Sequence, residues 1–247
     1  MWLYHKAKGG IKLHTLYDIT TQIPAFIHIT TAKVNDVNAM DVIPYESEAY
    51  YIFDRGYVDY TRLHKITNHS AYFVIRAKSN LNFDRMYSRK VDKTTGVECD
   101  QIGKLAGFYV SKQYPDKLRR VKFYDKETKR TFVFLTNNFE LSADQIALLY
   151  KNRWQVELFF KWIKQHLKIK CFWGTSENAV RIQIYSAIIA YCLVAIVGYD
   201  LKIERSTYEI LQVLGISLLD KTPVNELFTN LDYNDVNELD YNQLLFS

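Results

Sequence analysis

Short apolar runs separated by polar turns dominate the first part of the chain and predict strands. The predicted strands cover residues 11–19, 25–31, 49–53 and 71–77, and short helices are predicted over residues 35–43 and 59–68. The first two strands alternate apolar and polar positions, whereas the other two are short apolar runs typical of buried strands. Strands that alternate with helices in this order predict an α/β or α+β layer structure with a mixed sheet.

The pattern of apolar and polar residues changes between residues 80 and 137, where alternating runs predict a small antiparallel meander. Its strands are expected at residues 108–110, 120–124 and 131–135, with turns between them. This segment is also the most basic, because residues 76–130 carry 15 Lys or Arg against 7 Asp or Glu. We interpret it as an insertion into the main domain.

A helix is predicted to begin at Ser142 and to run to about residue 167. Ser142 and Gln145 form an S-x-x-Q capping pattern, and Asp144 suits the positive end of the helix dipole. The next helix contains residues 182–199, which include no charged side chain. Its length is at the lower edge for a bilayer span. We expect a core helix that is apolar all round, and a membrane-associated protein is the alternative.

The charge distribution indicates a polyanionic partner. Residues 150–170 carry 6 basic side chains against 1 acidic, whereas the chain from Asp200 onward carries 3 against 9. Two basic blocks favour duplex DNA, although basic runs are also common on solvated surfaces. The three cysteines, Cys99, Cys171 and Cys192, suggest neither a disulfide framework nor a zinc site. A cytoplasmic protein is therefore predicted.

Asp54 is the first candidate for chemistry. It follows the apolar run at residues 49–53 directly, so a rigid strand would hold its carboxylate at the edge of the sheet, as a metal ligand requires. Aspartate also begins many turns, and this is the alternative explanation of Asp54.

The second candidate is the segment around Glu157. On one uninterrupted helix, Tyr150, Arg153, Glu157 and Lys164 would fall within a sector of roughly 60°. This face would present a carboxylate for a metal together with cations for phosphate oxygens. An amphipathic helix with an Arg153–Glu157 pair is the alternative, but it does not explain why Lys161 and Lys164 follow without acidic partners.

Several motifs together resemble one large family of bacterial insertion-sequence transposases of the DDE type. The residues from Tyr150 to Lys164 fit the family signature Y-x2-R-x3-E-x6-K, and Asp54-Arg55-Gly56-Tyr57 resembles the block around the second catalytic aspartate. Two further segments are similar to family sequence: Lys8-Gly9-Gly10-Ile11-Lys12-Leu13-His14 and Gly174-Thr175-Ser176-Glu177-Asn178-Ala179-Val180. The resemblance covers roughly residues 6–200.

The resemblance implies a ribonuclease-H-like mixed sheet flanked by helices, with an inserted antiparallel β subdomain and a C-terminal helical region. The implied core comprises residues 1–83 and 136–200, the basic insertion residues 84–135, and the acidic tail residues 201–247. Asp54 and Glu157 would be the catalytic, metal-binding carboxylates, and Tyr150, Arg153, Lys161 and Lys164 would bind DNA. Two Mg²⁺ ions, or Mn²⁺ as a substitute, would drive phosphoryl transfer. The implied partners are double-stranded DNA, as transposon ends and target, and a second copy in a synaptic homodimer.

The family pattern also places a first catalytic aspartate upstream of the Lys8–His14 motif. This sequence has no Asp or Glu before Asp18, and Asp18 does not match the motif. Two hypotheses follow: the chain is an incomplete core of an active transposase, or it is a non-catalytic remnant that binds DNA or dimerises. The residues alone leave both open.

Overall fold

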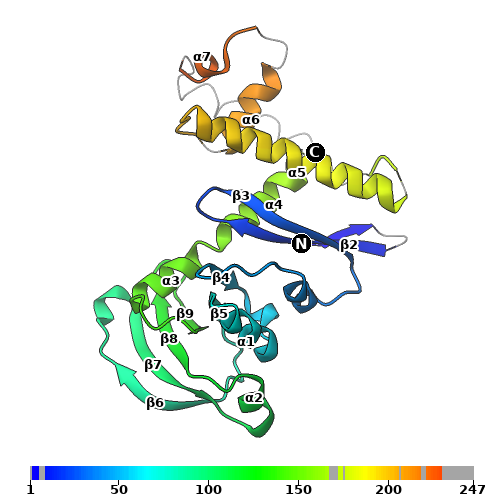
Figure 1. The fold of residues 1–247 in the computed structure, drawn as a ribbon. Coiled ribbons are helices and arrows are strands. Elements are labelled where there is room, and N and C mark those ends of the chain that lie inside the picture. The colour runs from blue at the N-terminus through cyan, green and yellow to red at the C-terminus, as the bar shows by residue number, and fades with distance from the viewer. Residues whose placement is uncertain are drawn as a thin grey trace. The chain divides into compact units, whose positions relative to one another are not determined.

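In the computed structural model, the described residues form two sheets with helices, followed by a helical segment (Figure 1). The structure describes residues 2–5, 9–166, 172–174, 176–205, 207–217 and 221–229. The chain divides into two compact units, Met1–Phe160 and Lys161–Ser247, and each is described by itself.

A six-stranded mixed sheet forms the centre of the first unit. Its strands lie in the order β4-β5-β9-β8-β7-β6, with β4 parallel to β5 and every other pair antiparallel. The bounds are β4 (Tyr50–Phe53), β5 (Tyr72–Arg76), β6 (Phe83–Arg89), β7 (Val97–Leu105), β8 (Leu118–Asp125) and β9 (Arg130–Thr136). This mixed sheet, with helices packed on it, fits a ribonuclease-H-like fold.

Strand β5 has apolar side chains on both faces of the sheet. Phe73 and Ile75 belong to one buried cluster with residues of helix α1 (Tyr60–Asn68), and Val74 belongs to a second cluster with residues of helix α3 (Ala143–Lys151). All three side chains have 0% exposure. Successive side chains of a strand point to opposite faces of the sheet, so a strand with an apolar cluster on each face needs an apolar residue at every position. This explains the short apolar run in the sequence.

A second sheet of three antiparallel strands precedes the first. It consists of β1 (Trp2–His5), β2 (Gly9–Asp18) and β3 (Ile23–Thr31), in that order. Two neighbouring side chains of β2 point to different partners: Leu16 packs against the cluster on the α1 side, and the ring of Tyr17 lies 5.3 Å from that of Phe159. An ion pair between the buried Lys12 and the partly exposed Asp36 (2.9 Å) joins β2 to the segment that follows β3.

A buried ion pair lies within the six-stranded sheet. Arg119 on β8 is fully buried, and its Nε and Nη2 donate to the two carboxylate oxygens of Asp100 on β7 at 2.8 and 2.9 Å. The Nη1 of Arg119 also donates to the backbone carbonyl oxygens of Asn138 and Leu141. The pair thereby ties two strands to the loop that precedes α3.

Helices make up the described part of the second unit. They are the end of α4 (Trp154–His166), then α5 (Glu177–Asp200), α6 (Thr207–Ile216) and α7 (Val224–Thr229). Trp162 packs edge-on against Tyr191 of α5, with ring centroids 4.9 Å apart. Gly198 of α5 faces Ile210 of α6, and a Cβ at Gly198 would lie 2.6 Å from the Ile210 side chain, so the absent side chain allows the two helices to approach.

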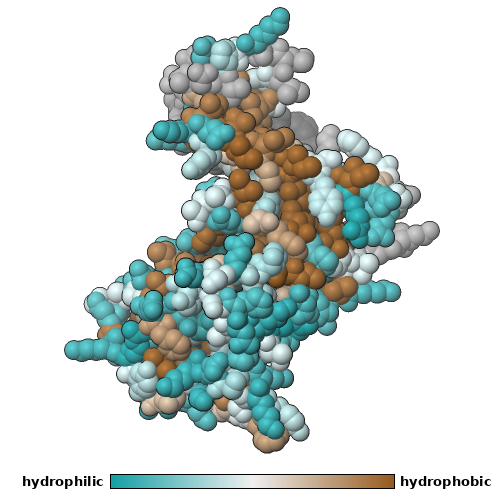
Figure 2. All heavy atoms as spheres, viewed as in Figure 1, coloured by the Kyte–Doolittle hydropathy of each residue, from teal (hydrophilic) through white to brown (hydrophobic). Residues whose placement is uncertain are grey.

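Helix α5 is long and apolar enough to cross a membrane, by length and composition alone. The helix is apolar all round, as expected, but within its most apolar window only 33% of the residues are buried, so it is a core helix only in part. Apolar residues gather over this part of the molecule in Figure 2. The exposed apolar side chains of α5 are Ile182, Tyr185, Ile189, Leu193, Ile196 and Tyr199. A single such helix is weak support for the membrane alternative.

Most of the predicted elements are confirmed, including the short helix at residues 35–43, which is the 3₁₀ helix η1 (Asp36–Asp41), but two predictions are wrong. Residues 108–110 begin a helix, α2 (Phe108–Gln113), instead of a strand, and strands β1, β6 and β7 were not predicted. The long helix from Ser142 is interrupted at Asn152 and Arg153 and becomes α3 and α4.

The basic strands do not stand apart as a separate layer. Strands β6, β7 and β8 continue the sheet that contains β4 and β5, so an inserted subdomain at residues 84–135 is not confirmed and stays a prediction. Cys99 and Cys192 are free thiols, whereas Cys171 lies outside the described residues. The acidic tail beyond Thr229 also lies outside them.

We predict that Asp100→Ala lowers the free energy of unfolding by about 3–5 kcal/mol, because it leaves the buried Arg119 guanidinium without a counter-charge. Glu98→Ala is the matched control, since Glu98 pairs with Lys122 on the exposed part of the same strand pair. Urea unfolding followed by circular dichroism measures both. Equal, small effects of the two substitutions would contradict the structural role given to Asp100.

Candidate active site

Asp54 follows the last residue of β4 and begins the 3₁₀ turn η2 (Arg55–Tyr57). Its Oδ1 accepts hydrogen bonds from the backbone N–H of Arg55 (2.7 Å) and from the hydroxyl of Tyr150 (3.2 Å). The capping role that the sequence offered as an alternative is therefore present. It does not exclude the functional one, because no hydrogen bond to Oδ2 is found among the described residues.

Tyr150 reaches Asp54 because α3 is held firmly on the sheet. Ser142 and Gln145 form the predicted capping box at the start of this helix. At its end, Tyr150 is buried against the β9 ring of Phe134, with ring centroids 4.7 Å apart. Burial, and then the nearby charge of Asp54, raise the pKa of the Tyr150 hydroxyl, so it remains a proton donor to the carboxylate.

Arg153 lies at the break between α3 and α4, beside both Tyr150 and Glu157. The hydrogen bonds across the break include one from Arg153 N to the carbonyl of Tyr150 and one from Val156 N to that of Arg153. The Arg153 guanidinium donates from Nη2 to Glu157 Oε1 at 2.7 Å, and its carbon lies 5.7 Å from the Tyr150 ring centre. The single helical face that the sequence predicted is thus wrong in form, yet these three residues still come together.

Arg153 is the electrostatic centre of this cluster. Burial opposes its charge, but the hydrogen bond to Glu157 and the charges of Glu157 and Asp54 raise the pKa of Arg153. Its Nε is buried without a hydrogen-bond acceptor among the described residues. A buried donor without an acceptor is costly, so this N–H is suited to an oxygen atom of a ligand.

Lys161 and Lys164 follow on α4, beyond Phe160. Both side chains are exposed, and neither has an ion-pair partner among the residues that the structure describes. They belong to the second compact unit, so the cluster at Asp54 is described without them. Their assignment to DNA binding stays a prediction.

Among the described residues, too few carboxylates lie together to hold two metal ions. No group of three or more His, Cys, Asp or Glu side chains that could hold a metal ion occurs among the described residues. Arg153 provides a counter-charge for Glu157. The described residues alone therefore do not fit a two-metal site, although the second oxygen of Asp54 and that of Glu157 are free of hydrogen bonds within the described part of the chain.

Sequence reasoning missed Arg76 and Phe132, which support the cluster from the sheet. The Arg76 guanidinium lies over the Phe132 ring at 4.9 Å, and that ring packs near Tyr150 at 6.2 Å. The charge of Arg76 also acts on the Tyr150 hydroxyl. One signal could have indicated the role of Arg76. It ends a predicted strand, and that strand would be the neighbour of the strand that precedes Asp54.

Comparison with known proteins supports the same interpretation. Residues 2–193 match the family described as the transposase DDE domain. A protein of Sinorhizobium fredii named as a transposase (y4zB) is 42% identical over 209 residues, which cover 82% of this chain and 57% of the relative. A Geobacillus stearothermophilus protein named as a transposase for insertion sequence element IS5377 is 33% identical over 193 residues, covering 77% of this chain and 50% of the relative.

The chain therefore spans about half the length of the curated relatives that it matches. Members of this family act on DNA and generally use divalent metal ions, and the cluster at Asp54 and Glu157 lies within the matched residues. On these grounds the chain belongs to the DDE transposase family.

Proposed function

We propose that this chain provides the catalytic face of a transposase that cleaves DNA strands at insertion-sequence ends and transfers them to a target. The observation that carries the proposal is the cluster of Asp54, Tyr150, Arg153 and Glu157, in which two carboxylates from distant parts of the sequence are linked through a phenol and a guanidinium. Asp54 and Glu157 would be the catalytic and metal-binding residues.

In this proposal Arg153 binds a phosphate oxygen next to the scissile bond. Its unpaired Nε–H supports that role, because a guanidinium presents several N–H groups to a phosphate in one plane. Tyr150 orients the Asp54 carboxylate through the hydrogen bond to Oδ1 and leaves Oδ2 available. Lys161 and Lys164 would extend the contact along the DNA backbone as exposed point charges.

The complete site would require a further carboxylate from a strand that pairs with β4. Among the described residues β4 pairs only with β5, so its other edge is open, and its sequence Tyr50-Tyr51-Ile52-Phe53 contains no charge or proline that would protect such an edge. Within the described part of the chain, β1 pairs with β2 only at residues 9–12, so that edge of β2 has no strand partner there from residue 13 onward. An additional strand between them, carrying the first aspartate, would lie beside Asp54, and Mg²⁺, or Mn²⁺ in its place, would bind there.

The remaining assignments follow from the resemblance. We propose residues 1–83 and 136–200 as the ribonuclease-H-like core without its first catalytic strand, residues 84–135 as the basic insertion, and residues 201–247 as an acidic tail. The partners would be duplex DNA and a second copy in the synaptic complex, in the cytoplasm at the nucleoid. A DNA-binding remnant without activity is the alternative, and the presence of only two carboxylates in the cluster supports it.

We predict that a version extended upstream of Met1 nicks supercoiled DNA in Mg²⁺ or Mn²⁺, and that Glu157→Gln reduces the nicking to background. The glutamine cannot supply the charge that a bound metal requires. Gel electrophoresis of the nicked circles measures the rate. Glu177→Gln is the matched control, because Glu177 makes the same i,i+4 pair with Arg181 at 2.7 Å.

If the extended version nicks and the chain without the extension does not, the proposed first aspartate is supported. Nicking that survives Glu157→Gln would refute the assignment of Glu157. An extended version that binds DNA but never nicks would favour the remnant.

We further predict that Arg153→Ala weakens duplex binding by roughly tenfold or more, the equivalent of about 1.5–3 kcal/mol for a hydrogen bond to a charged group. Arg181→Ala, which breaks the comparable pair on α5, should change the dissociation constant little. Fluorescence anisotropy with a labelled duplex compares the two variants. Equal effects would show that Arg153 has no special place in the binding of DNA.

A further inference from the structure

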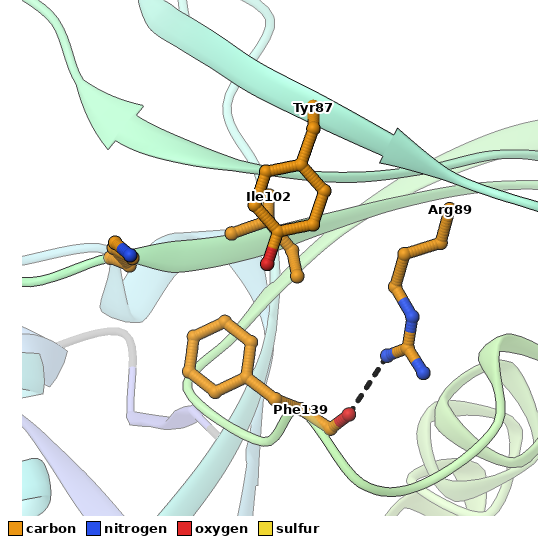
Figure 3. A pocket seen from close by; sticks show the side chains of 5 residues that line it. Tyr87, Arg89, Ile102 and Phe139 are labelled. Atoms are coloured by element: carbon orange, nitrogen blue, oxygen red, sulfur yellow. Dashed lines mark hydrogen bonds between the residues drawn. The ribbon is translucent and has the colours of Figure 1, made fainter.

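A pocket of about 320 Å³ lies on the six-stranded sheet, on the side of strands β6 and β7. Tyr87, Arg89, Ile102, Lys117 and Phe139 line it. In Figure 3, Tyr87 and Arg89 extend from one strand, Ile102 lies behind Tyr87, and Phe139 faces them from the loop below. The volume is within the range of pockets that bind small ligands, which is about 300–1,000 Å³.

The sheet register explains why these residue types meet. Tyr87 pairs opposite Ile102 and Arg89 opposite Asp100, so Tyr87 and Arg89 lie on one face of β6. The register shifts between Arg85 and Tyr87, which places a β-bulge immediately before the pocket. Bulges on edge strands redirect side chains and are common next to functional sites.

The pocket carries excess positive charge. Asp100 is shared by two guanidinium groups: Arg119 binds both of its oxygens, and Arg89 Nε lies 3.7 Å from Oδ2. The exposed Lys117 has no ion pair among the described residues. Two of the residues that line the pocket, Arg89 and Lys117, are therefore cationic and none is acidic, so an anion at the pocket would be attracted.

The Arg89 guanidinium is also held in place. Its Nη1 donates to the backbone carbonyl oxygen of Phe139 at 2.8 Å (Figure 3). This bond fixes the cation next to two accessible rings, since Tyr87 is 51% and Phe139 is 37% exposed. An aromatic and apolar surface beside fixed cations matches a ligand that has a planar ring and an anionic group.

We propose that this pocket binds an unpaired nucleotide of the DNA, with its base against Tyr87 and Phe139 and its phosphate against Arg89 and Lys117. The inference rests on the proposed function, from which DNA follows as the ligand. Only a base outside the double helix exposes its face to a protein ring, so the ligand is a nucleotide in single-stranded or unstacked DNA.

The pocket is separate from the cluster at Asp54. Asp54 follows the carboxyl end of β4, whereas Phe139 lies in the loop after β9, next to Asn138, which donates to the Tyr50 hydroxyl at the start of β4. Five interstrand steps lie between β4 and β6, which corresponds to about 24 Å at about 4.8 Å per step. The nucleotide in the pocket is therefore a different nucleotide from the one at Asp54 and Glu157.

The experiment compares two probes by fluorescence anisotropy: an eight-residue single-stranded oligothymidylate and a fully paired duplex. We expect Tyr87→Ala to weaken binding of the oligothymidylate by about five- to 160-fold, from about 1–3 kcal/mol for one base on an aromatic ring. Tyr87→Phe should keep the affinity because it keeps the ring. Tyr109→Ala is the control, since Tyr109 is 78% exposed on α2 and does not line the pocket.

A second pair of variants tests the cations that line the pocket. Lys117→Ala should weaken oligothymidylate binding more than Lys104→Ala, which removes an exposed lysine of β7 outside the pocket. Under ultraviolet light, an oligonucleotide that contains 5-iodouracil should cross-link to Tyr87 or Phe139, and mass spectrometry identifies the attached residue.

Each outcome separates this inference from the function on which it rests. If Tyr87→Ala binds the oligothymidylate as well as the unchanged chain does, while Arg153→Ala weakens the duplex, the pocket assignment is wrong and the transposase proposal stands. If the unchanged chain binds neither probe, both fail. If an acidic peptide that contains phenylalanine competes for the pocket and the oligothymidylate does not cross-link there, the ligand is a protein segment and the inference is overturned.

Discussion

Burial of β5 between two apolar clusters is the constraint on which the rest of the first unit depends. Phe73 and Ile75 hold α1 on one face, and Val74 holds α3 on the other, each at 0% exposure. Each such side chain contributes about 1.5–3 kcal/mol on burial. Because β4 pairs with β5, and α3 packs on β5, the positions of Asp54 and Tyr150 relative to one another follow from this arrangement.

Arg153 lies at the interruption after α3 and keeps helical spacing to its partners. It contacts Tyr150 three residues behind it and Glu157 four residues ahead of it, as residues at these spacings do on a helix. A guanidinium held between a phenol and a carboxylate, with one N–H unused, is organised before any ligand binds. The pocket at Tyr87 shares this feature, since a backbone carbonyl holds its arginine in place.

Local signals in the sequence predicted the parts of the fold that depend on local chemistry. The capping box at Ser142 and the carboxylate after a buried strand are examples, and both are present. Tertiary packing decided the rest. Phe108 and Tyr109 have strand-forming side chains but begin a helix after Gly107, whose φ of +101° no strand residue adopts. No glycine or proline marks the break at Asn152, and the pocket joins strand residues with a loop residue, which no spacing in the sequence reveals.

In the function that we propose, the carboxylate site is completed across the open edge of β4. Hydrogen exchange of the β4 amides, measured by mass spectrometry, tests it most directly, in this chain and in a version extended upstream of Met1. We expect exchange over Tyr50–Phe53 to slow in the extended version, because the amides that face the open edge gain hydrogen-bond partners, while exchange over β5 changes little. Unchanged exchange over Tyr50–Phe53 in an extended version that nicks DNA would show that catalysis does not require a strand at this edge, and the proposed completion of the site would be wrong.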